Sequence, residues 1–296
     1  MPDVSGAVKI LSMAKFIYDK FEEVEETIRD IAPPIVYKIR GDIKNEFHRN
    51  LLEHQQAWFA APKDLNDPHD IRTPLRFNIN ELDDPKFLQK IKDSFIQTHP
   101  SIAVGERELN VIAENKLEEI RADPENYFRE GYDRVKESDI YDRVGLFSCT
   151  IDPLNETMWA HYGNNHKGFA VGFHTVELAR SIQCSIGSVN YSDEVPLHSF
   201  LVEPSSSDSD RFFLKSKKWD YEKEFRLYTV SDEPLSSRIR VFSKDSVAEV
   251  VIGYDFEENE IGDLINMINA VYGPRVEVYR LKVSSAGYGF DKIRVK

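Results

Sequence analysis

The chain has 296 residues, of which 41% are hydrophobic and 11% aromatic, so it carries enough apolar material for a sizeable core. Its 38 Lys and Arg residues and 51 Asp and Glu residues give a net charge of -13, which argues against a general attraction to nucleic acid or to an anionic membrane. Cys149 and Cys184 lie far apart and lack the spacing of zinc ligands. We therefore expect a cytoplasmic protein with buried cysteines, no metal and no membrane-spanning segment.

Apolar residues recur at helical spacing from residue 7 to residue 31, and two prolines follow them. We therefore expect an N-terminal amphipathic helix within residues 1–34. Long helical patterns with few β-branched runs return at about 84–137. The sequence thus predicts a single α+β domain of catalytic type over residues 35–296, with a helical insertion at about 84–137.

Further elements alternate between short strands and isolated helices. The expected strands are 35–40, 57–60, 144–149, 169–173, 188–191, 224–230, 238–242, 249–252 and 276–281. The expected helices between them are 45–54 and 257–271. Hairpin-like strand pairs and clustered helices favour an α+β fold with a mixed, mainly antiparallel sheet over a regular βαβ winding. The chain has no GxGxxG or GxxxxGK[ST] motif that would indicate a nucleotide-binding loop.

The segment WDYEKEFR, residues 219–226, places Glu222 and Glu224 two positions apart. In a strand, this spacing directs both carboxylates to one face, and Arg226 continues that face as a candidate ion-pair partner. Two neighbouring acids can divide catalytic roles, because one raises the pKa of the other. The alternative is a solvated edge strand whose acids pair with nearby lysines.

The segment MWAHYGNNHKGF, residues 158–169, concentrates polar and aromatic groups in a predicted helix and the loop after it. Its candidate binding or catalytic residues are Trp159, His161, Tyr162, His166 and Lys167. A lone histidine of this kind is more often a structural donor than a catalytic base, and two histidines five apart are weak evidence for a metal.

Two shorter segments carry further candidates. Asn66 and Asp67 in LNDP are typical of a turn in which the side chains bind their own backbone. Tyr37, Lys38 and Arg40 end the first predicted strand, where they could bind an anion such as phosphate or be exposed strand residues.

Taken in order, the segments YKIR, WFAAPKDLNDP, FSCTIDPLNETMWAHYGNNHKGFAVGF, VNY, KKWDYEKEFRLY and VVIGYDF resemble a bacterial family catalogued as domain of unknown function 2971. The shared signatures are NDP, WxHYxxxHxG and YExExR, and the resemblance runs from about Tyr37 to about Tyr254. The family is in turn distantly similar to the ADP-ribosyltransferase superfamily. That similarity implies an ADP-ribosyltransferase-like sheet.

The resemblance implies an enzyme that uses NAD as substrate, cleaves its nicotinamide glycosidic bond and transfers ADP-ribose to a macromolecular acceptor. It places Arg40, Ser148 and the Glu222–Glu224 pair at the three catalytic positions of the superfamily. Glu224 would stabilise the oxocarbenium-like transition state, and Glu222 would orient the acceptor. In the remaining roles, Arg40 or Lys38 would hold the diphosphate, and Trp159 or Tyr162 would stack on nicotinamide or adenine.

A bacterial toxin or phage-defence effector would fit this chemistry, and two alternatives stay open. One is a non-enzymatic nucleotide-sensing or protein-binding module of a defence system, in which the WxHY segment forms the recognition pocket. The other is a nuclease that uses Asp67, His161 and Glu224. Asn66, Asp67, His161 and Tyr162 are also a candidate catalytic set. The acceptor, the oligomeric state and the activating signal are not evident from the sequence.

Overall fold

The computed structural model of the chain describes residues 29–30, 32–72, 76–137, 139–195, 197–199, 201 and 212–295. Nearly all of the expected N-terminal amphipathic helix lies outside the described residues, and only Arg29 and Asp30 of it are described, both helical. Within these residues, no helix is both long and apolar enough to cross a bilayer.

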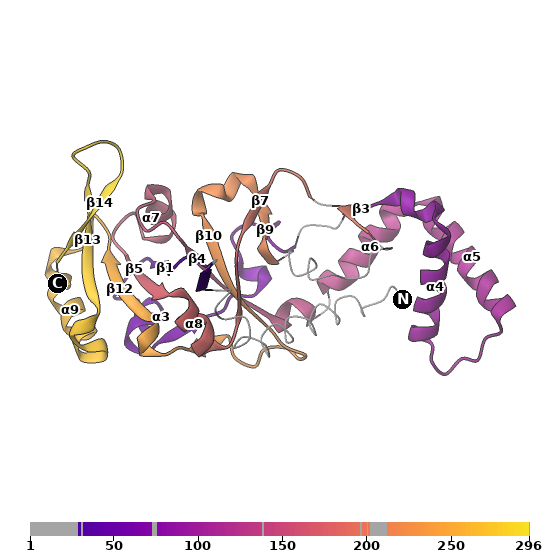
Figure 1. Cartoon of the computed structure of the whole chain (residues 1–296), viewed down its shortest axis with the longest axis horizontal. Coiled ribbons are helices and arrows are strands. Elements are labelled where there is room, and N and C mark those ends of the chain that lie inside the picture. The colour runs from indigo at the N-terminus through magenta and orange to yellow at the C-terminus, as the bar shows by residue number, and fades with distance from the viewer. Residues whose placement is uncertain are drawn as a thin grey trace.

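An eight-stranded sheet forms the centre of the molecule (Figure 1). Its strands, in spatial order, are β14 (Phe290–Arg294), β13 (Glu277–Val283), β12 (Val247–Ile252), β5 (Phe169–His174), β1 (Ile35–Arg40), β4 (Val144–Thr150), β10 (Glu224–Val230) and β6 (Ser185–Ser188). Every neighbouring pair is antiparallel except β12 and β13. The predicted α+β class with a mixed, mainly antiparallel sheet is therefore confirmed.

Helices cover both faces of this sheet. The helices α3 (Glu46–Glu53), α8 (Thr175–Ile182) and α9 (Glu258–Tyr272) pack on one face and contribute to the largest apolar core, which also includes Val36 and Phe225. The short helix α7 (Glu156–Tyr162) packs on the opposite face with Tyr37 and Ile39. Successive residues of β1 thus enter different cores, as the alternation of a strand requires.

The pairing between β1 and β4 is limited to one point in the sheet. These two strands share one registered pair, Tyr37 with Thr150, whereas β1 and β5 pair along six residues. Beside this point, the Lys38 ammonium donates to the main-chain oxygen of Ser148 at 2.6 Å. A side chain therefore takes the place of a ladder hydrogen bond where the strands separate.

The predicted helical insertion is present as α4 (Pro85–Thr98), α5 (Glu106–Ala122) and α6 (Pro124–Glu137). These helices lie at one end of the molecule, opposite the end that carries β13, β14 and α9 (Figure 1). They have a small core of their own around Leu82, Phe87 and Ile120. Next to them, β3 (Arg76–Phe77) pairs with β8 (Leu197–His198).

Some boundaries differ from the sequence-based predictions. The second strand is shorter than expected, as β2 (Gln56–Trp58), and pairs with β11 (Ile239–Val241). The single strand predicted at 188–191 is two strands, β6 and β7 (Asn190–Ser192), of which β7 pairs with β9 (Leu214–Ser216). Neither α8 nor β14 was expected. The buried residues of α8 follow helical spacing that the sequence interpretation did not identify, whereas β14 is short and lacks a clear period.

Candidate functional site

Strand β10 carries two of the predicted site residues, Glu224 and Arg226. Phe225 and Leu227 enter the largest core, so Glu224 and Arg226 point to the opposite face of the sheet. Because β10 lies between β4 and β6, the alternative of a solvated edge strand is wrong. Glu224 is 4% exposed and Arg226 is 0% exposed.

Glu222 reaches this face in a different way from the one predicted. It is the last residue of a 3-10 helix, η5 (Lys217–Glu222), and Lys223 then adopts a left-handed conformation with φ 42°. The strand starts only at Glu224. The prediction that strand alternation places both acids on one face is therefore wrong, since a tight turn, and not the pleat, brings them together.

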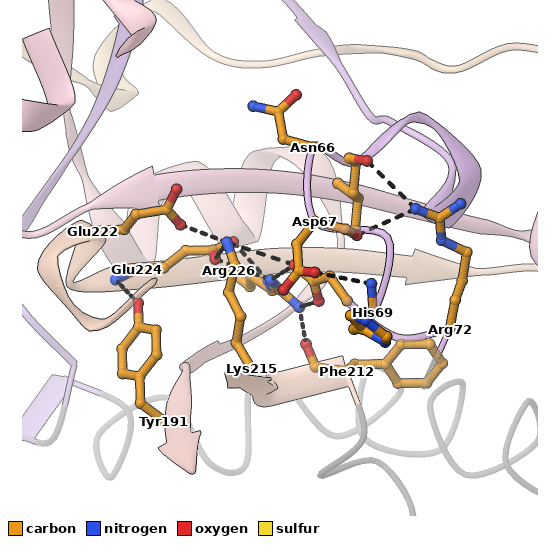
Figure 2. Close-up of polar contacts among 12 residues, drawn as sticks. Asn66, Asp67, His69, Arg72, Tyr191, Phe212, Lys215, Glu222, Glu224 and Arg226 are labelled. Atoms are coloured by element: carbon orange, nitrogen blue, oxygen red, sulfur yellow. Dashed lines mark hydrogen bonds and ion pairs between the residues drawn. The ribbon is translucent and has the colours of Figure 1, made fainter. Parts of the chain in front are cut away.

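The acids meet two cations in what we call the acid cluster, consisting of Asp70, Lys215, Glu222, Glu224 and Arg226. Figure 2 labels Lys215, Glu222, Glu224 and Arg226. The Lys215 ammonium lies 2.5 Å from Glu222 Oε2, 3.1 Å from Glu224 Oε2 and 3.6 Å from Asp70 Oδ2. Arg226 Nε donates to Glu224 Oε1 at 2.6 Å, and its Nη1 and Nη2 bind Asp70 at 2.9 and 2.5 Å. Each charge therefore has a partner of opposite sign.

The acid cluster is nevertheless unbalanced. With every group ionised, two cations and three carboxylates sum to a charge of 2 - 3 = -1, and no member is more than 9% exposed. Burial raises the pKa of Asp70 although Arg226 opposes it. Burial also raises the pKa of Glu224, but Arg226 and Lys215 outweigh that effect and lower it to about 2. Glu224 is therefore a fixed anion at neutral pH.

Side chains from two other segments approach the cluster from its rim. The Tyr162 hydroxyl at the end of α7 donates to Glu222 Oε1 at 2.6 Å, and the exposed Asn66 amide donates to the same hydroxyl at 3.3 Å. His161 Nδ1 lies 3.2 Å from the Tyr221 hydroxyl, next to Glu222 in the chain. The NDP, WxHY and YExExR signatures therefore come together in space.

Other predicted residues have contacts that serve the fold. Asp67 is buried and its Oδ1 accepts the His69 amide at 2.9 Å, which is the turn expected from LNDP. Trp159 has no exposed surface, and its Nε1 donates to Pro153 O at 2.8 Å, so the proposed stacking of a substrate on Trp159 is not available. Arg226 is likewise fully enclosed by its ion pairs rather than open to a substrate.

The loop after α7 follows a left-handed path through Asn164, Asn165 and His166. The His166 ring contacts Phe290 of β14 at 5.5 Å between centroids, and Lys167 is exposed. No contact among the described residues joins His166 or Lys167 to the acid cluster.

The first-strand residues separate into two groups. The Tyr37 hydroxyl donates to Glu249 on β12 at 2.9 Å, away from the acid cluster. Lys38 and Arg40 share the sheet face of Val36, opposite to that of Glu224, and the Arg40 guanidinium lies 5.7 Å from the ring centre of Phe47. Burial, aided by Arg40, lowers the pKa of Lys38 to about 8.

Of the three predicted catalytic strands, two meet at the acid cluster. Ser148 on β4 pairs in register with Arg226 and contributes to the low pKa of Glu224. The charges of Glu224 and Glu222 also act on Lys38, because both raise its pKa and so partly offset the effect of burial. Arg40 has no such interaction with the cluster, and its buried Nε lacks a hydrogen-bond partner among the described residues.

Sequence reasoning missed Asp70 and Lys215. Asp70 follows the NDP turn, and Lys215 lies on β9, four residues before the WDYEKEFR segment. Nothing in the local pattern distinguishes either from the many other charged residues of the chain. The one available signal was that the signature YExExR has two glutamates but only one arginine. If the segment is buried, the second carboxylate requires a cation from elsewhere in the chain.

One family model matches part of the chain. Residues 158–227 match the model of a family described as "Protein of unknown function (DUF2971)". This segment of the chain is therefore similar to DUF2971. The matched segment begins in α7 and ends in β10, so it contains Tyr162, Lys215, Glu222, Glu224 and Arg226. No curated protein and no solved structure matches the chain significantly.

Proposed function

We propose that this protein is an ADP-ribosyltransferase-like enzyme that cleaves the nicotinamide glycosidic bond of NAD and transfers the ADP-ribosyl group. The observation that carries the proposal is the meeting of three distant sequence signatures at one carboxylate, Glu222. Asn66, Tyr162 and Lys215 all contribute to its surroundings, although 156 positions separate Asn66 from Glu222. Residues so far apart have no local reason to share a site.

The charge of the acid cluster suits this reaction. Cleavage of an N-glycosidic bond develops positive charge on the ribose, and a fixed negative charge in a poorly solvated site stabilises it strongly. Glu224 is anchored through both oxygens by Arg226, whereas Glu222 Oε1 binds only the rim side chain Tyr162 among the described residues. We therefore assign the stabilising role to Glu222 and a positioning role to Glu224.

The diphosphate of NAD needs a cation, and we assign that role to Lys38. Lys38 starts from the opposite face of the sheet, but at the gap between β1 and β4 it lies close enough to the acid cluster for Glu224 and Glu222 to influence its pKa. Lys38 is partly buried where β1 and β4 separate, and it donates to a main-chain oxygen rather than to a carboxylate. Its ammonium therefore retains donors for a phosphate. The proposal includes a cytoplasmic role as a bacterial toxin or phage-defence effector, with an acceptor still to be identified.

The test is nicotinamide release from NAD by the purified full chain. Glu222→Gln keeps the shape of the side chain and removes its charge, so we expect release to fall about a hundredfold or more. Glu249→Gln is the matched control, because Glu249 is also a buried carboxylate bound by a tyrosine and a lysine. Wild-type protein that neither releases nicotinamide nor binds NAD contradicts the proposal.

The burial of the acids favours a second candidate function, a non-enzymatic nucleotide-sensing or protein-binding module. Glu222 and Glu224 are only 3% and 4% exposed, as in an ion network that stabilises a fold. Tight NAD binding without nicotinamide release, or a co-purified nucleotide in native mass spectra, supports this alternative. No group of three metal-ligating side chains occurs in the described part of the chain, so no observation favours the nuclease.

A further inference from the structure

Neither carboxylate of the YExExR signature can itself reach a substrate without moving. Glu222 and Glu224 are 3% and 4% exposed, and the side chains of Tyr162, Lys215 and Arg226 bind their oxygens. A group that attacks a substrate has to touch it. The reacting group of the site must therefore be a side chain at the rim that is connected to these acids.

The Tyr162 hydroxyl has the required position. Tyr162 is only partly buried, its hydroxyl donates to Glu222 Oε1, and the exposed Asn66 marks the outer side of the same hydroxyl. The 2.6 Å separation is that of a hydrogen bond to a carboxylate. One lone pair of the phenol oxygen accepts the Asn66 hydrogen bond, so the second lone pair is available to bond to a carbon of the substrate.

Resting on the proposed function, we infer that Tyr162 is the nucleophile that attacks the ribose of NAD and that Glu222 is its general base. In the first step, a bond forms between Tyr162 Oη and C1' of the nicotinamide ribose. The bond from C1' to the nicotinamide nitrogen breaks, and its electron pair leaves with neutral nicotinamide. The phenolic proton passes to Glu222 Oε1 as the bond to C1' forms, after positive charge has developed on the ribose, so Glu222 is still an anion while it stabilises the oxocarbenium-like state.

In the second step, water or the acceptor displaces the tyrosine at C1', and Glu222 returns the proton to Tyr162 Oη while the incoming group loses its own proton to solvent. Atoms and charge balance without any oxidant or metal. A tyrosine paired with a carboxylate is a known alternative to a carboxylate nucleophile in glycoside cleavage.

The protonation of Tyr162 agrees with a base-assisted attack. Burial and the charge of Glu222 raise the pKa of Tyr162, so the resting hydroxyl keeps its proton, while Asn66 and Lys215 act in the opposite direction. The proton therefore leaves only as the bond to carbon forms. Lys215 holds the second oxygen of Glu222 at 2.5 Å and directs the first toward the tyrosine.

The experiment uses the full chain with NAD and with an NAD analogue that carries fluorine at C2' of the nicotinamide ribose. Fluorine slows both steps, because each passes through an oxocarbenium-like transition state, and the glycosyl-enzyme accumulates because neutral nicotinamide leaves more readily than tyrosine. We expect intact mass to rise by one ADP-ribosyl group and peptide mapping to place it on Tyr162. Tyr162→Phe should lose the adduct and about a thousandfold or more of nicotinamide release.

Tyr272→Phe is the matched control, because it removes a buried hydroxyl that binds only main-chain Leu52 O and side-chain Gln55, far from the acids. If the wild type and Tyr162→Phe release nicotinamide at the same rate, the inference is wrong, but the proposed function stands. Release from the analogue with no adduct on Tyr162 also overturns the inference. Absence of release by the wild type refutes the proposed function itself.

Discussion

Two buried carboxylates, one in the sheet and one just before strand β10, bind nearly the same donors. Glu249 on β12 accepts the Tyr37 hydroxyl at 2.9 Å and the Lys292 ammonium at 2.7 and 2.9 Å. Glu222 accepts the Tyr162 hydroxyl at 2.6 Å and the Lys215 ammonium at 2.5 Å. In each case a glutamate, a tyrosine and a lysine meet from distant parts of the chain.

Their charge balance differs. Around Glu249, one acid faces one lysine whose side chain is 28% exposed, and the contact ties β14 to β12 across β13. The acid cluster encloses three acids and two cations, with Lys215 and Arg226 at 8% and 1% side-chain exposure. A fold needs only the balanced arrangement. Surplus buried charge is costly and is therefore a sign of function.

The largest expected effect comes from Arg226, which holds two acids at once. Arg226→Met leaves Asp70 and Glu224 buried without their main partner, so we expect a loss of about 3 to 5 kcal/mol in the free energy of unfolding, measured with urea. The triple variant with Asp70→Asn and Glu224→Gln should recover a large part of that loss. A single variant within about 1 kcal/mol of wild type would mean that the cluster is solvated.

The two lysines offer a direct test of the difference. Lys215→Met should cost about 3 kcal/mol in unfolding free energy, because its three acids have little access to water. Lys292→Met should cost at most about 1 kcal/mol, because its side chain is partly exposed and the pair is screened. If both variants lose the same unfolding free energy in urea, burial does not make the acid cluster different from the Glu249 site.

Acid should destabilise the protein through Glu224. The pKa of Glu224 in the folded protein is about 2, below the ordinary value of 4.5, so its contribution is complete above about pH 5 and is lost as the pH falls toward 2. A pKa shift of this size corresponds to about 3 kcal/mol from this group. The raised pKa of Asp70 acts in the opposite direction, so wild type and Glu224→Gln must be compared. Parallel curves of melting temperature against pH contradict the expectation.

A further small effect concerns the tyrosines. Tyr37→Phe and Tyr162→Phe each remove one hydrogen bond to a carboxylate, so each should cost about 1 to 2 kcal/mol in unfolding free energy. A much larger loss for Tyr162→Phe in thermal or urea unfolding would assign that hydroxyl a mainly structural role.

Much of the fold was predictable because its signals are local. The helix predicted at 257–271 is α9, and Asn45 and Asn155 cap α3 and α7 through their side chains. The helical insertion is likewise evident from the apolar spacing. The short elements α8 and β14 were missed. The buried positions of α8 follow helical spacing that went unrecognised, whereas the five residues of β14 show no period.

The site was predictable in part. Glu222, Glu224 and Arg226 were identified as a polar group that a plain strand would not need, and Tyr162 and Asn66 as companions. The reason given for the two acids was wrong, because the left-handed turn at Lys223 has no signature in YEKEF. Left-handed positions favour glycine, asparagine, aspartate and histidine, so a lysine gives no indication of one.

The sequence by itself determined which segments carry the polar groups, the α+β class and the order of the three signatures. Only the tertiary structure decided that these segments meet, that Lys215 and Asp70 complete the cluster, and that Arg40 faces the other side of the sheet. The physical reason is that the energy of a charge depends on its burial and on partners far along the chain. The local sequence identifies which side chains are charged, whereas the packing of the fold determines how buried each one is and which partners it has.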